Sequence, residues 1–321
     1  MAKKPPKEKA IQKPAKNPAA KKKIAPLPAA QKKVASKPPA KKKAVKTDAK
    51  QPIKEKKLAV KPTSTAFQAK LAAGEKFHQA GKLKEAWEAY QAILKLEPRN
   101  YVVVHGMALI AAQMRDFKMA ASLFNNAIEI DPSNPRAYNN LANVSAELGD
   151  KNAAIKHYGK AIGLDGKYVD AIKNRGLVHS GLKQYEQALA DFSEVLRLYP
   201  SYWQAHLHKG NIYIAMNQVN DAIDAYNLAL ALTPNSPVLY NNLAALYGSL
   251  KQFDKALKYA DQALKIDARY AEALNNRAVI LAGLDRLQDA LKDYQGAITL
   301  RPNYEDALKG KAALERRLTK A

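Results

Sequence analysis

The protein has 321 residues, a net charge of +24 and no cysteine. The absence of cysteine excludes disulfides, cysteine-based zinc sites and thiol catalysis, and no run of about 18 apolar residues predicts a membrane-spanning helix. We expect a cytoplasmic protein, because the basic N-terminus lacks the apolar segment of a secretory signal.

Most of the net charge comes from residues 1–66. This segment contains 21 lysines, ten of the 17 prolines, three acidic residues and no aromatic residue. So few apolar side chains cannot bury a core, and the lysines repel one another, so the free energy of folding does not offset the entropy of ordering the chain. We therefore expect a disordered, extended tail ahead of a folded body.

Two interpretations of the tail remain open: a solvated spacer, or an arm that binds DNA, RNA, anionic lipid or an acidic protein. Its composition resembles that of the Lys/Ala/Pro tails of linker histones and of bacterial histone-like proteins. The lysines that would contact a polyanion are Lys21, Lys22, Lys23, Lys32, Lys33, Lys41, Lys42 and Lys43. Because the tail has no aromatic ring and no arginine, binding to nucleic acid would be independent of sequence and would weaken steeply with salt. In a eukaryote, Lys41–Lys43 would also be a candidate nuclear-import signal.

Residues 67–304 repeat with a period of 34 residues. The pentapeptide YNNLA occurs at Tyr138–Ala142 and again at Tyr240–Ala244, an offset of 102 residues, or three periods. In units counted from Phe67, position 8 is always Gly or Ala and position 20 is always Ala. Position 24 is Tyr or Phe in six of the seven units, and position 32 is Pro in five. The seven units need no insertion or deletion.

Each unit has apolar residues at helical spacing in two segments, at positions 1–14 and 18–31. Small residues at positions 8 and 20 allow the two helices to approach closely, and the aromatic ring at position 24 fills the remaining space. Proline at position 32 ends the second helix. One such hairpin cannot bury its apolar face alone, so we expect the units to stack into a solenoid.

This series of small residue, alanine, aromatic residue and proline resembles the tetratricopeptide repeat (TPR) over all of residues 67–304. The resemblance implies an all-α, right-handed superhelix (α-solenoid) of seven helix-turn-helix repeats. The repeats are 67–100, 101–134, 135–168, 169–202, 203–236, 237–270 and 271–304. Residues 305–321 restart a first helix and place the charged Glu315 where earlier units usually carry an apolar or aromatic residue. We expect this segment to be a C-terminal capping helix.

The resemblance also implies a concave groove for peptides or partner proteins, lined by positions 2, 5, 6, 9, 12 and 13 of the first helices. The two asparagines of YNNLA fall at positions 5 and 6. An amide offers a donor and an acceptor together, so it can pair with an extended backbone without reading its sequence. The candidate contacts are Asn139, Asn140, Asn143, Lys173, Asn174, His208, Asn211, Asn241, Asn242, Asn275 and Asn276. Alternatively, these side chains merely solvate the groove.

One TPR subtype binds the C-termini of Hsp70 and Hsp90 through a carboxylate clamp. The clamp needs Lys at position 5 and Asn at position 9 of one unit, Asn at position 6 of the next, then Lys at 2 and Arg at 6 of the third. Units three to five supply Asn143 and Asn174, but Asn139, Gln204 and His208 occupy the positions of the cations. Units five to seven also lack the cations. We therefore do not expect a chaperone-tail receptor.

Nothing in the sequence predicts catalysis, a cofactor or a metal. No phosphate-binding loop, dinucleotide fingerprint or zinc-hydrolase helix occurs. His206 and His208 are two residues apart and therefore project from different faces of a helix, which is a poor arrangement for binding one metal ion.

The expected function is a non-catalytic adaptor that binds an extended partner segment in the groove, with the tail as a tether to an anionic partner. One alternative is a nucleic-acid-associated protein in which the lysine tail is the main ligand site. Another alternative is an assembly factor on an anionic membrane surface. Its binding to that surface would weaken as salt screens the charges.

Overall fold

The computed structural model describes residues 65–319, which form fifteen α-helices and contain no strand. The helices are α1 (Thr65–Gln79), α2 (Leu83–Leu94), α3 (Tyr101–Gln113), α4 (Phe117–Ile130), α5 (Pro135–Glu147), α6 (Lys151–Leu164), α7 (Val169–Gly181), α8 (Tyr185–Leu198), α9 (Trp203–Ala215), α10 (Val219–Leu232), α11 (Pro237–Ser249), α12 (Phe253–Ile266), α13 (Ala271–Gly283), α14 (Leu287–Leu300) and α15 (Glu305–Leu318). The all-α prediction is confirmed for this part of the chain. None of these helices is long and apolar enough to cross a membrane. The predicted tail, with its eight candidate lysines, lies outside the described residues apart from its last two positions.

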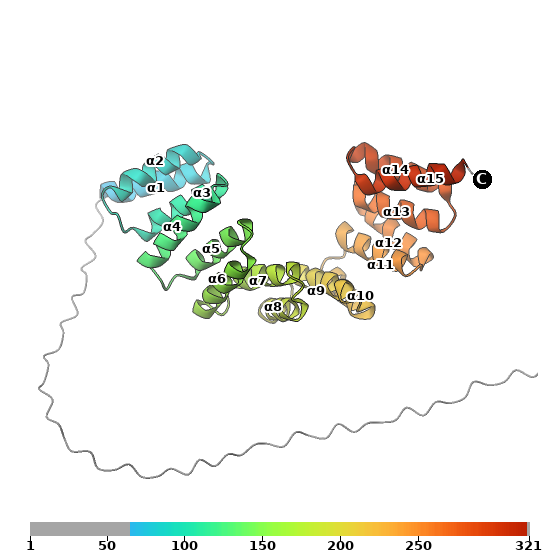
Figure 1. Ribbon diagram of the computed structural model, residues 1–321, viewed down its shortest axis with the longest axis horizontal. Coiled ribbons are helices and arrows are strands. Elements are labelled where there is room, and N and C mark those ends of the chain that lie inside the picture. The colour runs from blue at the N-terminus through green and yellow to red at the C-terminus, as the bar shows by residue number, and fades with distance from the viewer. Residues whose placement is uncertain (1–64, 320–321) are drawn as a thin grey trace, which may run out of the picture. The chain divides into compact units, whose positions relative to one another are not determined.

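The helices pack as seven hairpins in chain order, α1 with α2 through α13 with α14, and α15 packs on α14 and α13 (Figure 1). Each even-numbered helix also contacts the first helix of the next hairpin. Odd-numbered helices of neighbouring hairpins touch as well, as in α3 with α5, α5 with α7 and α11 with α13. We call the surface made by positions 2, 5, 6, 9, 12 and 13 of the odd-numbered helices the odd-helix face.

The core of each hairpin is built from the small and aromatic positions of the repeat. The alanine at position 20 is 0% exposed in all seven hairpins. The residue at position 24 is 0–5% exposed in all seven hairpins: Tyr90, Phe124, Tyr158, Phe192, Tyr226, Ala260 and Tyr294. Because alanine leaves room at the helix contact, the ring can lie between the helices and bury most of its area, and burying such area stabilises the hairpin.

Side-chain hydrogen bonds cap the N-termini of several helices. Asn100, Asn134 and Ser236 cap α3, α5 and α11, and Asp116 and Asp150 cap α4 and α6. In each case a side-chain oxygen accepts a backbone N–H of the first turn, which has no partner inside the helix. Such caps typically contribute about 1 kcal/mol each.

Every turn inside a hairpin contains one residue in the left-handed region, always at position 15 of the repeat. Only two of these residues are glycine; the full set is Gly81, Arg115, Gly149, Lys183, Asn217, Lys251 and Asp285. The backbone closes around them in the pattern of a Schellman cap, as where Asp116 N donates to Ala111 O over 2.9 Å. The bonds of this cap offset the cost of about 1 kcal/mol or more that a side chain bears at positive φ.

The ring of Tyr90 shows how closely neighbouring helices pack around position 24. It is 2% exposed and lies between two glycines of neighbouring odd-numbered helices. A Cβ at Gly74 would be 2.7 Å from the ring, and a Cβ at Gly106 would be 2.8 Å from it. The ring therefore cannot move away from one helix without colliding with the other.

Gly106→Ala should lower the free energy of unfolding by about 1–3 kcal/mol, because the added methyl group overpacks this contact. Gly163→Ala in α6 is the matched control. A Cβ there meets nothing within 4 Å, so the variant should gain about 0.5–1 kcal/mol from helix propensity alone. Urea unfolding followed by circular dichroism measures both changes. A shift in the same direction for both variants would contradict the steric explanation.

Candidate functional site

The strongest candidate site on the odd-helix face is centred on Tyr226, which crosses from α10 to reach two predicted groove residues. Its hydroxyl donates to Asn211 Oδ1 over 2.6 Å. Burial raises the pKa of Tyr226 to about 12, and a hydrogen bond from Asn242 to the same phenol opposes this rise in pKa. The phenol thus accepts from Asn242 and donates to Asn211. Within the described residues, the Asn211 amide nitrogen and the Asn242 carbonyl oxygen then have no partner.

The equivalent residues form a similar group two repeats earlier, but there the second asparagine bonds to the first asparagine and not to the phenol. The Tyr158 hydroxyl donates to Asn143 Oδ1 over 2.5 Å, and the same oxygen accepts the Asn174 amide nitrogen over 3.2 Å. Burial raises the pKa of Tyr158 to about 12, so the phenol stays a donor at neutral pH. Again one amide nitrogen, that of Asn143, and one amide oxygen, that of Asn174, are left without a partner in residues 65–319.

We call these two groups the amide sites: Tyr158, Asn143 and Asn174, and Tyr226, Asn211 and Asn242. Sequence reasoning found their asparagines but missed the tyrosines that orient them, although the signal was present. Repeats three and five combine Tyr at position 24 with Asn at position 9, whereas repeats two and four combine Phe with Leu. In these four repeats a hydroxyl at position 24 accompanies an amide at position 9, whereas Tyr90 and Tyr294 occur with Glu75 and Val279.

Three predicted contact residues lie beneath the face instead of on it. Asn139, Asn241 and Asn275, all at position 5, are 5%, 6% and 7% exposed. Asn241 Oδ1 accepts from Asn276 over 2.9 Å, and the Asn139 amide nitrogen donates to Asn140 over 3.2 Å. Position 5 lies against the neighbouring odd-numbered helix, so its amides support the position 6 side chains and are not accessible to a ligand.

Two other predicted contacts are already engaged. His208 stacks on Phe192 with ring centroids 5.0 Å apart, and burial, assisted by Lys173, lowers its pKa. Lys173 Nζ forms an ion pair with Asp170 over 2.9 Å. The structure therefore places His208 as a neutral, packed ring and Lys173 as a paired cation.

His105 is a residue of this face that sequence reasoning missed. Its ring lies between Tyr101 and Phe124, and its Nε2 is 3.0 Å from the Asn140 amide nitrogen. An amide nitrogen can only donate, so Nε2 accepts and the imidazole is neutral. Burial, with a smaller effect from Arg136, lowers the pKa of His105 to about 4.

This pKa predicts a loss of stability in mild acid. An unfolded histidine titrates near pH 6.5, so the folded state binds fewer protons below that pH, and the stabilisation is lost as pH falls from about 6.5 toward 4. Between pH 7.5 and 5.0 the free energy of unfolding should fall by about 1–2 kcal/mol through His105. His105→Phe keeps an aromatic ring and should flatten that part of the pH dependence. An unchanged slope in urea titrations of the variant would rule out His105 as its source.

The odd-helix face also carries exposed aliphatic side chains that the asparagine pattern did not predict. Val102, Leu177, Ile214, Val238 and Val279 are 37–52% exposed. Leu177 belongs to the repeat between the two amide sites. The face thus combines oriented amides with apolar surface, as peptide-binding grooves do.

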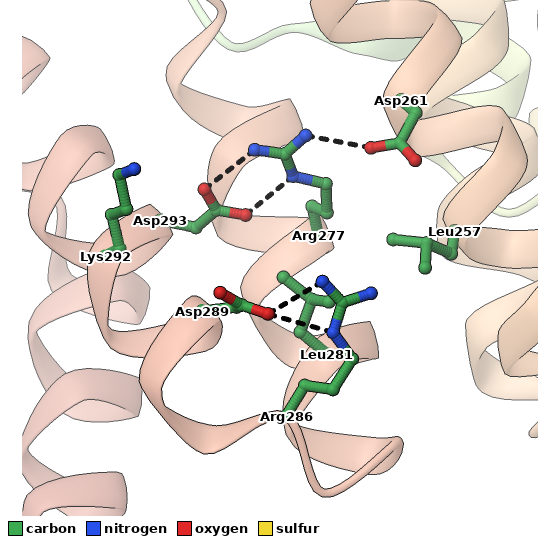
Figure 2. Close-up of a pocket in the computed structure, with 8 residues that line it drawn as sticks. All are labelled: Leu257, Asp261, Arg277, Leu281, Arg286, Asp289, Lys292 and Asp293. Atoms are coloured by element: carbon green, nitrogen blue, oxygen red, sulfur yellow. Dashed lines mark hydrogen bonds and ion pairs between the residues drawn. The ribbon is translucent and has the colours of Figure 1, made fainter.

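A pocket of about 200 Å³ lies away from this face among α12, α13 and α14. Figure 2 shows Arg277 held by Asp293, with contacts of 2.6 and 2.8 Å, and by Asp261 at 2.8 Å, while Arg286 pairs with Asp289. These bonds, above all those to Asp293, raise the pKa of Arg277. Because the Arg277 guanidinium is satisfied by Asp293 and Asp261, this network serves to fasten repeats six and seven. No group of three His, Asp or Glu side chains in residues 65–319 is arranged to hold a metal ion.

Family models agree with this architecture. Tetratricopeptide repeat models match residues 169–202, 237–270, 103–134, 123–156 and 271–301, and a TPR repeat model matches residues 210–251. The chain is a tetratricopeptide repeat protein. The resemblance found in the sequence is confirmed, and the repeats make the chain a protein-interaction scaffold.

Solved TPR structures share the fold at low sequence identity. A tetratricopeptide repeat protein from Parabacteroides merdae matches with a TM-score of 0.62 and 19% identity, covering 78% of this chain and 100% of that one. The C-terminal part of a TPR repeat-containing protein from Cytophaga hutchinsonii has a TM-score of 0.63 and 14% identity, covering 75% and 98%. Yeast Tom70 has a TM-score of 0.57 and 21% identity, covering 81% and 59%. No curated protein matches the sequence.

Proposed function

We propose that this TPR protein is a non-catalytic, cytoplasmic adaptor that holds an extended segment of a partner protein against its odd-helix face. The observation that carries the proposal is the pair of amide sites. Each presents one free N–H donor and one free carbonyl acceptor, held in place by a buried tyrosine.

These groups match the chemistry of an extended backbone. Such a backbone offers one N–H and one C=O per residue, and neither is satisfied by neighbours along its own chain. An amide that is already oriented loses little side-chain entropy on binding, so more of the interaction energy contributes to affinity. Two such sites, two repeats apart, would hold one ligand at two points along its length.

The chain itself supplies a conservative way to remove the amide sites. Repeats two and four carry Phe and Leu where repeats three and five carry Tyr and Asn. The quadruple variant Tyr158→Phe, Asn143→Leu, Tyr226→Phe and Asn211→Leu copies that pattern and should keep the fold. Partners captured by the full-length protein from nuclease-treated lysate, once identified and purified, should bind this variant at least about 10-fold more weakly, since each good hydrogen bond contributes about 1 kcal/mol.

The matched control is the double variant Asn152→Leu and Asn227→Leu, which changes two exposed asparagines of the even-numbered helices α6 and α10. It should retain the partners at unchanged affinity. If the quadruple variant retains the same partners at the same affinity while its helicity is intact, the amide sites do not bind them, and the asparagines serve solvation alone.

We further propose that residues 1–66 tether the adaptor to an anionic partner. The support is the charge distribution: 21 of the 53 basic residues lie in this segment, but only three of the 29 acidic residues. A chain so rich in lysine attracts polyanions through counterion release and does so without sequence preference.

The tether predicts salt-dependent binding of the full-length chain to a 30-base-pair DNA duplex, to RNA of equal length or to phosphatidylserine vesicles. Affinity for a nucleic acid should fall by roughly 0.7–0.9 log units per contacted phosphate for each tenfold rise in salt. Changing the eight candidate tail lysines to Gln should reduce that slope. If the variant and the wild type show the same salt slope, these lysines are not the contacts. If the variant also loses its protein partners, that result favours the nucleic-acid-associated alternative.

A further inference from the structure

We infer that the ligand segment bound by α9 and α11 is uncharged and inserts a branched aliphatic side chain between these helices. The inference rests on the proposed function and deepens it by naming the class of ligand. Three features carry it: a largely apolar pocket at an amide site, the lack of charge at the face positions of α9 and α11, and the pairing of the charges at the face positions of the flanking helices.

The pocket has a volume of about 260 Å³ and lies between α9 and α11. Ile214, Ala245 and Leu246 form its apolar lining, and Asn211, Asn242, Tyr226 and Ser249 line it with polar groups. The Ser249 hydroxyl is already used, because it donates to Leu246 O over 2.7 Å. Ile214 is 40% exposed. Since a cavity of about 150 Å³ is enough for a benzene ring, a leucine or isoleucine side chain fits this volume.

The polar groups at the pocket suit a peptide backbone on either side of that side chain. The Asn211 amide nitrogen is free to donate and the Asn242 carbonyl is free to accept, because Tyr226 occupies the other half of each amide. A side chain flanked by a bonded N–H and a bonded C=O would be aimed into the pocket by its own backbone.

The face positions of α9 and α11 provide no countercharge for a charged ligand. Positions 2, 5, 6, 9, 12 and 13 of α9 and α11 contain no Asp, Glu, Lys or Arg. The His208 ring is kept neutral by burial and by Lys173. Placing an unpaired charge in such an environment is strongly unfavourable, so the surface selects against charged side chains.

The charges at these positions on the flanking helices are already paired. Asp170 and Lys173 on α7 are 2.9 Å apart. Glu272 on α13 is 2.6 Å from Arg301. A ligand charge would therefore have to compete with an existing ion pair on either side, whereas an aliphatic side chain meets Leu177 on α7 or Val238 on α11.

A phage-displayed library of random 12-residue peptides tests the inference directly. The full-length protein is the bait, and peptides that also bind the quadruple amide-site variant are discarded, since that variant has the same lysine tail. The remaining peptides should share an aliphatic residue flanked by uncharged residues. In synthetic versions, changing that residue to Ala should weaken binding at least about 10-fold, and changing it to Lys or Glu should weaken it further.

The variant Ile214→Asp tests the same inference by changing the pocket instead of the peptide. A carboxylate in the pocket should weaken the aliphatic peptides at least about 10-fold and strengthen the Lys versions. Val279→Asp is the control, because Val279 is 52% exposed on the same face but lies outside this pocket. It should leave both affinities unchanged, and both variants should retain wild-type helicity.

The outcomes separate the two claims. If no selected peptide depends on the amide sites, the proposed function fails and this inference fails with it. If amide-dependent peptides are recovered but are rich in charged residues, or are insensitive to Ile214→Asp, the inference alone is overturned. Aliphatic, uncharged peptides that Ile214→Asp rejects and Val279→Asp retains would establish it.

Discussion

The packing of one aromatic ring between small residues is the contact on which six of the seven repeats depend; repeat six has Ala260 in place of the ring. The ring at position 24 can be buried only because alanine stands at position 20 and glycine or alanine at position 8. Where the ring belongs to tyrosine, its hydroxyl reaches the odd-helix face. In repeats three and five it fixes the amides there. The interaction that holds the helices together therefore also determines the polar chemistry of the surface, and the rigidity of the core is transmitted to the candidate site.

Much of the fold could be predicted because its determinants recur every 34 residues. The small, alanine and aromatic positions carry packing information that seven copies make unambiguous. The turns were harder to predict, because glycine is the usual signal for a positive φ. Five of the turns place another residue there: Arg115, Lys183, Asn217, Lys251 and Asp285. Their backbone is held by the cap formed with the preceding helix, which is a property of the hairpin and not of the single residue.

The candidate site was predictable only in part, for a related reason. Positions 5 and 6 both carry asparagine in YNNLA. The residue type alone does not reveal that position 5 lies against the neighbouring odd-numbered helix. Burial of Asn139 and Asn241 depends on how closely adjacent repeats approach. The aliphatic residues of the face, such as Ile214, looked like ordinary members of a helical pattern until the packing showed which of them remained exposed.

The coupling between the core ring and the surface amide also has an evolutionary consequence. Replacing Tyr226 by Phe alone would leave the Asn211 oxygen without its donor, and replacing Phe192 by Tyr alone would place a hydroxyl near Leu177, which cannot accept it. The two positions are therefore energetically coupled in such repeats, and a change by single substitutions passes through a mixed pair, such as Tyr294 with Val279 in repeat seven. A solenoid of this kind would diversify its surface in whole-repeat steps, by duplicating or exchanging repeats of either form, more readily than by single substitutions.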